Sequence, residues 1–175
     1  MMGFLQTSTR TRIGIGLCVF GWIFNVIGFS TPGWLMTTPT NGSTAYILGL
    51  FHACQYRSLV LISHCGALPD KKPSWWATTK QLHIVGMLLG VACVAVLFGY
   101  ALVKNDKKWL TKVGLVLALA SATFIAAGAT VFGVSSNEIT DDYFEEIERT
   151  QFTISWSYTT LLIGVIQMLM GVLMA

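Results

Sequence analysis

The chain has 175 residues, of which 54% are hydrophobic and only 11% are charged, and its mean hydropathy is +0.64. This composition is unusual for a soluble domain, and the length leaves no room for a separate soluble domain beside a membrane-embedded one. The formal net charge of +3 is small, so the placement of the charges is more informative than their sum.

Four apolar runs dominate the sequence, and none of them contains Asp, Glu, Lys or Arg. They cover about residues 13–30, 81–103, 113–137 and 150–175. A helix rises about 1.5 Å per residue, so roughly 20 apolar residues cross the ~30 Å hydrocarbon layer of a bilayer. We therefore predict four transmembrane helices in a single integral membrane domain over residues 1–175. A soluble bundle is the less favoured alternative, because each of its helices would need a polar face.

The first run has a second interpretation, as a cleaved signal peptide. Arg10 and Arg12 precede the run and resemble the charged start of such a peptide. Asn25 lies within the run, however, and residues 30–32 (Ser-Thr-Pro) form a poor cleavage site. These features favour a helix that is retained.

Basic residues indicate how the helices are oriented. Two short segments, one before the first run and one between the second and third, hold most of them: Arg10, Arg12, Lys104, Lys107, Lys108 and Lys112. Lys and Arg in short loops mark the cytoplasmic side of a membrane. We therefore expect a multi-pass plasma membrane protein with both termini in the cytoplasm and outer loops at about residues 31–80 and 138–149. A nucleic-acid or phosphoinositide patch is the less favoured explanation of the lysines.

The long first outer loop carries two of the four cysteines, Cys54 and Cys65. The outer compartment is oxidising, so we expect these two to form a disulfide bond that stabilises the exposed loop by about 3 kcal/mol. Cys18 and Cys93 fall inside apolar runs and should pack as small hydrophobic residues. Asn41 begins an Asn-Gly-Ser triplet in the same loop and is a candidate glycosylation site.

Residues 46–48 and 58–63 of this loop are rich in aliphatic and aromatic side chains, which favours two short strands. Lone hairpins are marginal in water, so further strands should complete an antiparallel sheet that rests on the helix ends.

Small residues recur every four positions in two of the predicted helices: Gly86 and Gly90 in the second, and Gly114, Ala118, Ala122 and Ala126 in the third. This spacing lets helix backbones approach closely, either within the monomer, which we favour, or across a homodimer. Asn25 and Gln167 are polar residues in apolar helices and should form hydrogen bonds inside the bundle.

No pattern of residues indicates catalysis. The three histidines, His52, His64 and His83, lack the spacing of metal ligands, and no nucleophile–base pair is visible. We therefore expect that the protein is not an enzyme and has no catalytic residue, no cofactor and no metal, and that it binds lipid rather than nucleic acid.

The second outer loop is acidic through Glu138, Asp141, Asp142, Glu145, Glu146 and Glu148. Ile139, Tyr143 and Ile147 recur at helical spacing, which predicts that the third helix extends outward. A solvated face or a partner contact is favoured over a calcium site there, because the acids do not follow the order of a calcium-binding loop.

Trp34, the segment Gly49-Leu50-Phe51, and the pair Cys54 and Cys65 resemble the first-loop signature of the claudin superfamily, with Phe51 in place of the more usual Trp. Residues 152–158 are similar to the peripheral myelin protein and epithelial membrane protein branch of that superfamily. The resemblance implies a membrane fold that is mainly α: a left-handed four-helix bundle with an extracellular antiparallel β-sheet from the first outer loop. It also implies that the disulfide joins neighbouring strands.

The resemblance implies a cell junction or adhesion protein that meets itself or related claudin-like proteins in cis and in trans, and so forms or tunes a paracellular barrier. Apolar side chains of the outer loops are candidate contacts: Leu59, Leu61, Trp75, Trp76, Tyr143 and Phe144. Burial against the protein's own sheet or the lipid headgroups is an equally weighted alternative. A stargazin-like auxiliary subunit of an ion channel or receptor is the alternative function, and a myelin-type membrane organiser is a third.

Overall fold

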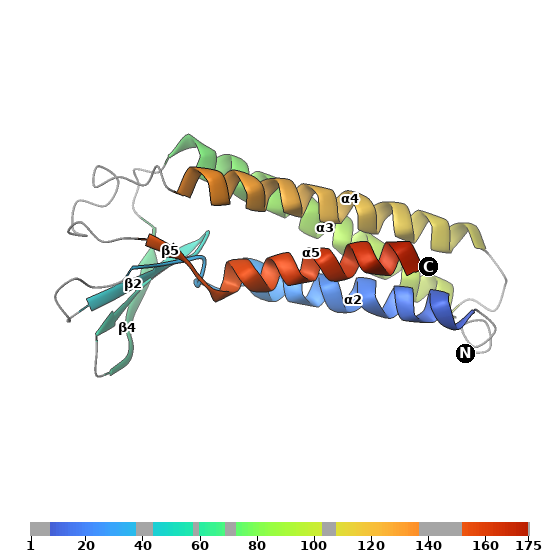
Figure 1. Ribbon diagram of the computed structural model, residues 1–175, viewed down its shortest axis with the longest axis horizontal. Helices are drawn as coiled ribbons and strands as arrows, with labels where there is room; N and C mark the ends of the chain where they lie inside the picture. Colours follow the sequence, from blue (N-terminus) through green and yellow to red (C-terminus); the bar gives the residue numbers. More distant parts are fainter. Residues whose placement is uncertain are drawn as a thin grey trace.

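The computed structural model describes residues 8–37, 44–57, 60–68, 73–102, 108–136 and 152–174. Within these ranges the chain forms four long helices and one five-stranded antiparallel sheet. The helices lie side by side with the sheet at one end of the bundle, and the start of the first helix and the end of the last lie at the other end (Figure 1).

All four helices are long and apolar enough to cross a membrane. They are α2 (Thr9–Ser30), α3 (Ser74–Leu102), α4 (Lys108–Ser135) and α5 (Trp156–Met174). In the most apolar stretch of each helix only 28–39% of the residues are buried, so the outer surface of the bundle is apolar as well and suits a lipid bilayer. By length and composition, the prediction of four membrane-spanning helices is confirmed.

The helix boundaries differ from the predicted ones. α3 begins at Ser74 rather than near residue 81, because Lys80 interrupts the apolar run without ending the helix; its ammonium lies 4.6 Å from the centre of the Phe51 ring. α5 begins at Trp156 rather than near residue 150, because Phe152–Ile154 forms the strand β5. Hydropathy does not separate a short apolar strand from the helix that follows it. The predicted outward extension through residues 139–147 lies outside the described residues.

The helices pack as two close pairs, α2 with α5 and α3 with α4, and α4 also contacts α5. Glycines permit the close approach of α2 and α5: a Cβ added to Gly21 would lie 2.6 Å from the Gly164 carbonyl oxygen, and the reverse distance is also 2.6 Å. In the other pair, Ser121 donates a hydrogen bond to the Gly86 carbonyl oxygen at 2.7 Å. The small-residue stripe of α4 therefore packs inside the chain, where Ala118 is fully buried.

Cys18 and Cys93 within the helices are also buried, as is Asn25. Cys18 and Cys93 are free thiols in the packed core, as expected. The Asn25 amide nitrogen donates to the Met168 sulfur at 3.2 Å. The side-chain oxygens of Asn25 and Gln167 are buried without a hydrogen-bond partner among the described residues, so the predicted hydrogen bonding is wrong for these oxygens.

The sheet has the strand order β4-β3-β2-β1-β5, and every neighbouring pair is antiparallel. Its strands are β1 (Leu35–Thr37), β2 (Thr44–Leu48), β3 (His52–Arg57), β4 (Val60–Ala67) and β5. The predicted strand at 46–48 falls in β2. Of the predicted strand at 58–63, residues 60–63 fall in β4 and the first two lie outside the described residues, whereas β1, β3 and β5 were missed. The sheet is not built from the first loop alone, because Leu35 of β1 pairs with Leu48 on one side and with Ile154 of β5 on the other.

Candidate functional site

Trp34 lies between α2 and β1 and attaches the sheet to the bundle. Its side chain is 0% exposed, and its indole Nε1–H donates a hydrogen bond to the Gly28 carbonyl oxygen of α2 at 2.8 Å. Its backbone N–H donates to the Leu48 carbonyl oxygen of β2, and its own carbonyl oxygen accepts from the Ser155 N–H after β5, both at 3.0 Å. One residue is therefore held by a helix and by the segments on both sides of β1.

The indole ring of Trp34 also contacts the other three helices. Its centroid lies 5.1 Å from that of His83 in α3, 4.8 Å from that of Phe132 in α4 and 5.8 Å from that of Tyr158 in α5, each time edge to face. Such pairs contribute about 0.5–1.5 kcal/mol each beyond their burial. These four residues, Trp34, His83, Phe132 and Tyr158, form what we call the aromatic joint. Through it the sheet is tied to all four helices.

The segment Gly49-Leu50-Phe51 makes a second attachment. Leu50 is fully buried, and its carbonyl oxygen accepts a hydrogen bond from Trp76 Nε1 of α3 at 3.3 Å. The Phe51 ring packs edge to face on Phe29 of α2, with the centroids 5.0 Å apart. Gly49 leaves no room for a side chain, since a Cβ there would lie 2.5 Å from a backbone carbon of the turn after α2. The signature residues of the sequence are thus structural attachments.

Cys54 and Cys65 form a disulfide bond between β3 and β4, where they lie directly opposite each other with their Cα atoms 4.1 Å apart. Cys54 is buried, whereas His64 to Ala67, including Cys65, are exposed. β4 stands at the end of the strand order, so among the described strands it has a neighbour on one side only. We call β3 and β4, with their disulfide, the stapled hairpin.

Most of the predicted contact residues are not placed on an exposed surface. Trp76 is 1% exposed, and Trp75 is partly buried with its ring centroid 5.7 Å from that of Phe132. Partner contact and burial against the protein's own sheet were equally weighted for Trp76. The structure shows burial, because the Trp76 indole packs beneath the sheet and donates its N–H there. Leu61 lies in β4. The remaining contact candidates, Leu59, Tyr143 and Phe144, lie outside the described residues. The candidate glycosylation site Asn41 does so too.

His83 is a buried core residue. Its Nδ1 lies 2.8 Å from the Thr79 carbonyl oxygen one turn earlier, and a Cβ added to Gly128 of α4 would collide with its ring. Sequence reasoning did not connect His83, Phe132 or Tyr158 with Trp34. All three residues lie near the helix ends that adjoin the outer loops, and this shared position in the sequence could have predicted that their rings meet Trp34. Within the described ranges, no group of three His, Cys, Asp or Glu residues is arranged to hold a metal ion.

A family model described as "Lipoma HMGIC fusion partner-like protein" matches residues 12–175. The chain belongs to the lipoma HMGIC fusion partner-like family. The assignment to the claudin superfamily is therefore wrong, and the junctional and channel-auxiliary functions inferred from it are withdrawn. Among curated proteins, none matches this chain.

The motif that suggested claudins has a physical explanation in this member of the lipoma HMGIC fusion partner-like family. Trp34 and residues 49–51 attach a small sheet to helix ends, and Cys54 with Cys65 staples the outer strands. Any four-helix membrane protein that carries such a sheet faces the same structural requirements. The motif therefore identifies an architecture and not a family or a function.

Proposed function

We propose that this lipoma HMGIC fusion partner-like protein is a non-enzymatic plasma membrane protein that presents its stapled hairpin to a protein partner on the exoplasmic side. The observation that carries the proposal is the attachment of the sheet to all four helices through Trp34 while residues 64–67 of the hairpin stay exposed. A sheet tied to the whole bundle keeps its orientation relative to the membrane. Recognition sites supported by rigid elements hold their geometry better than sites on loops.

Charge placement supports this orientation. Arg10 and Arg12 lie in the first turns of α2, and Lys108 and Lys112 lie in those of α4, at the end of the bundle away from the sheet (Figure 1). Lys and Arg beside membrane spans mark the cytoplasmic side. The disulfide, at the opposite end, calls for an oxidising compartment. Both arguments support the proposed orientation, in which the sheet lies outside and both termini lie in the cytosol. A left-handed bundle, the commoner geometry of membrane helices, completes the proposed fold.

Two exposed tryptophans support the position of the bilayer. Trp109, at the start of α4, is 57% exposed, and Trp156, at the start of α5, is 53% exposed. They lie at opposite ends of the bundle, because α4 begins away from the sheet and α5 begins beside it. Tryptophan is enriched at both membrane–water interfaces. The apolar surface between the two residues then faces the hydrocarbon layer.

The outer edge of β4 supplies the proposed recognition chemistry. The backbone N–H and C=O groups along the outer edge of an edge strand are available to pair with an extended segment of another chain. The exposure of His64 to Ala67 leaves this part of β4 accessible. We propose no catalytic role for the buried histidine beneath the sheet, His83, because Thr79 and the rings of the aromatic joint surround it.

The substitution Leu61→Asn tests the proposal, because it creates the glycosylation triplet Asn-Ile-Ser within β4. The matched control is Leu61→Asn combined with Ser63→Ala, which keeps the loss of the leucine but abolishes the triplet. We expect the single variant to gain an endoglycosidase-sensitive mass shift, since the proposal places β4 on the exoplasmic side and residues 64–67 of the same strand are exposed. We also expect its glycan to block strand pairing with the partner.

The readout is surface cross-linking of the full chain in cells that express it naturally, followed by sizing of the cross-linked species. The wild type and the double variant should give the same complex, and the glycosylated variant should lose it at equal surface abundance. A glycosylated variant that keeps the complex contradicts the docking role of β4. A single variant that reaches the surface without a glycan contradicts the exoplasmic, exposed placement of the hairpin.

A further inference from the structure

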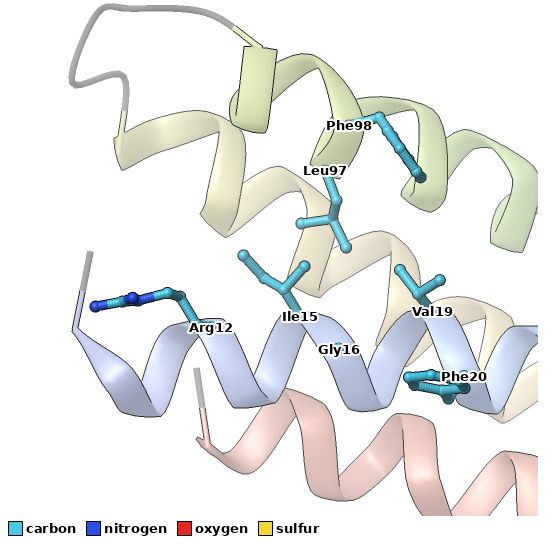
Figure 2. A pocket seen from close by; sticks show the side chains of 7 residues that line it. All are labelled: Arg12, Ile15, Gly16, Val19, Phe20, Leu97 and Phe98. Atoms are coloured by element: carbon cyan, nitrogen blue, oxygen red, sulfur yellow. The ribbon is translucent and has the colours of Figure 1, made fainter. Parts of the chain in front are cut away.

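A groove opens between α2 and α3 at the end of the bundle away from the sheet. These two helices are not close partners, because α2 packs on α5 and α3 packs on α4. The space between them has a volume of about 260 Å³. Figure 2 shows Ile15 and Leu97 pointing toward one another across it, with Val19 beside them and Arg12 nearest the end of α2.

The walls of the groove are apolar and open to the outside of the bundle. Ile15 and Leu97 are buried at its floor, whereas Phe20 and Phe98 at its rim are 61% and 57% exposed. Gly16 also lines it, and a Cβ added there would meet nothing within 4 Å. Because these residues lie within membrane-spanning helices, the groove faces hydrocarbon. A dry apolar cavity of about 150 Å³ already holds a benzene molecule, so this groove has room for a segment of an acyl chain.

Arg12 gives the groove a charged mouth. It lies one turn before Ile15, toward the start of α2, and its side chain extends toward the bundle end in Figure 2. Arg10 and Lys112 lie in the first turns of α2 and α4 at the same end of the bundle, and Lys112 is exposed. A guanidinium group matches phosphate oxygens in geometry and charge. An acyl chain in the groove therefore places an anionic headgroup beside Arg12, at the end of the bundle that carries the other basic residues.

We propose that this groove binds one acyl chain of an anionic phospholipid of the cytosolic leaflet, with Arg12 contacting the headgroup phosphate. The occupant is a lipid because the groove is apolar, opens within the bilayer and has cationic residues only where headgroups lie. The assignment to the cytosolic leaflet follows the orientation proposed above. Binding itself does not depend on the hairpin, so its failure leaves the hairpin's proposed role untouched.

The test uses the full chain in nanodiscs of phosphatidylcholine containing a minor fraction of phosphatidylserine, followed by native mass spectrometry of the released protein. Gly16→Leu places a bulky side chain in the groove, at a position where an added Cβ meets nothing within 4 Å. Gly99→Leu is the matched control, since a Cβ at Gly99 also meets nothing within 4 Å and the residue does not line the groove. Arg12→Gln removes the charge and keeps a polar side chain.

We expect the wild type and Gly99→Leu to retain one phosphatidylserine molecule in preference to phosphatidylcholine. Gly16→Leu should lose it, and Arg12→Gln should lower the preference by about tenfold, the effect of one charge-assisted contact. Equal retention by Gly16→Leu and Gly99→Leu overturns the proposal, as does a wild type without preference for the anionic lipid. Retention of a second copy of the chain that Gly16→Leu releases overturns it as well.

Discussion

Replacing Trp34 with alanine should release the sheet from the helix bundle. Truncating a fully buried tryptophan costs about 3–5 kcal/mol in transfer and cavity free energy. At Trp34 the change also removes three edge-to-face ring contacts and the donor to the Gly28 carbonyl oxygen. Since these terms overlap, we expect a loss toward the upper end of that range. For a chain of this size, 1 kcal/mol corresponds to roughly 2–4 °C in Tm, so the Tm should fall by about 10 °C or more.

The assay is thermal unfolding of the purified chain in detergent micelles, followed by near-ultraviolet circular dichroism. The matched control is Trp109→Ala, which truncates a tryptophan that is 57% exposed at the far end of the bundle and should cost less than about 1 kcal/mol. Trp34→Phe keeps a ring but loses the Nε1–H donor, and it should fall between the two. Equal destabilisation by Trp34→Ala and Trp109→Ala would refute the idea that Trp34 joins the sheet to the bundle.

Two further experiments test the disulfide bond and the helix packing. The double substitution Cys54→Ser and Cys65→Ser removes a disulfide bond between residues 11 positions apart and should lower the free energy of unfolding by about 3 kcal/mol. Surface biotinylation should then show less protein at the cell surface. Unchanged surface delivery and an unchanged Tm would mean that the hairpin does not need its disulfide. Gly21→Ala forces a methyl group against the backbone of Gly164 and should destabilise the chain by about 1–3 kcal/mol, measured by unfolding in detergent. The control is Gly16→Ala in the same helix, which should be neutral or stabilising because an added Cβ there meets nothing within 4 Å. Similar effects of the two alanines would contradict the close approach of α2 and α5.

The helices could be predicted because the hydrocarbon layer imposes a length and a composition that few other sequences meet. Their ends could not, since Lys80 interrupts the hydropathy without ending α3, and the strand residues 152–154 are as apolar as the helix that follows them. The cysteine pair was predictable from compartment and count. The packing partner of each helix could not be predicted, because small residues permit the close approach of another helix but do not indicate which helix it is.

The aromatic joint shows the same limit. Trp34 was identifiable from the motif, but the rings around it come from three helices that hydropathy treats as interchangeable. The role of Trp76 could not be decided from the sequence, because a tryptophan near a helix end serves equally well at a membrane interface or beneath a sheet, and only tertiary packing decides between them. The family assignment was wrong because residues required by an architecture carry little information about ancestry.

The most direct test of the central claim is labelling of the native chain with a membrane-impermeant maleimide on intact cells. We expect no label at Cys54 or Cys65 until a membrane-impermeant reductant has opened their bond, and labelling of both afterwards, while Cys18 and Cys93 stay unmodified in the buried core. Labelling of either loop cysteine without reduction, or only after the cells are permeabilised, would contradict a stapled hairpin displayed outside the membrane.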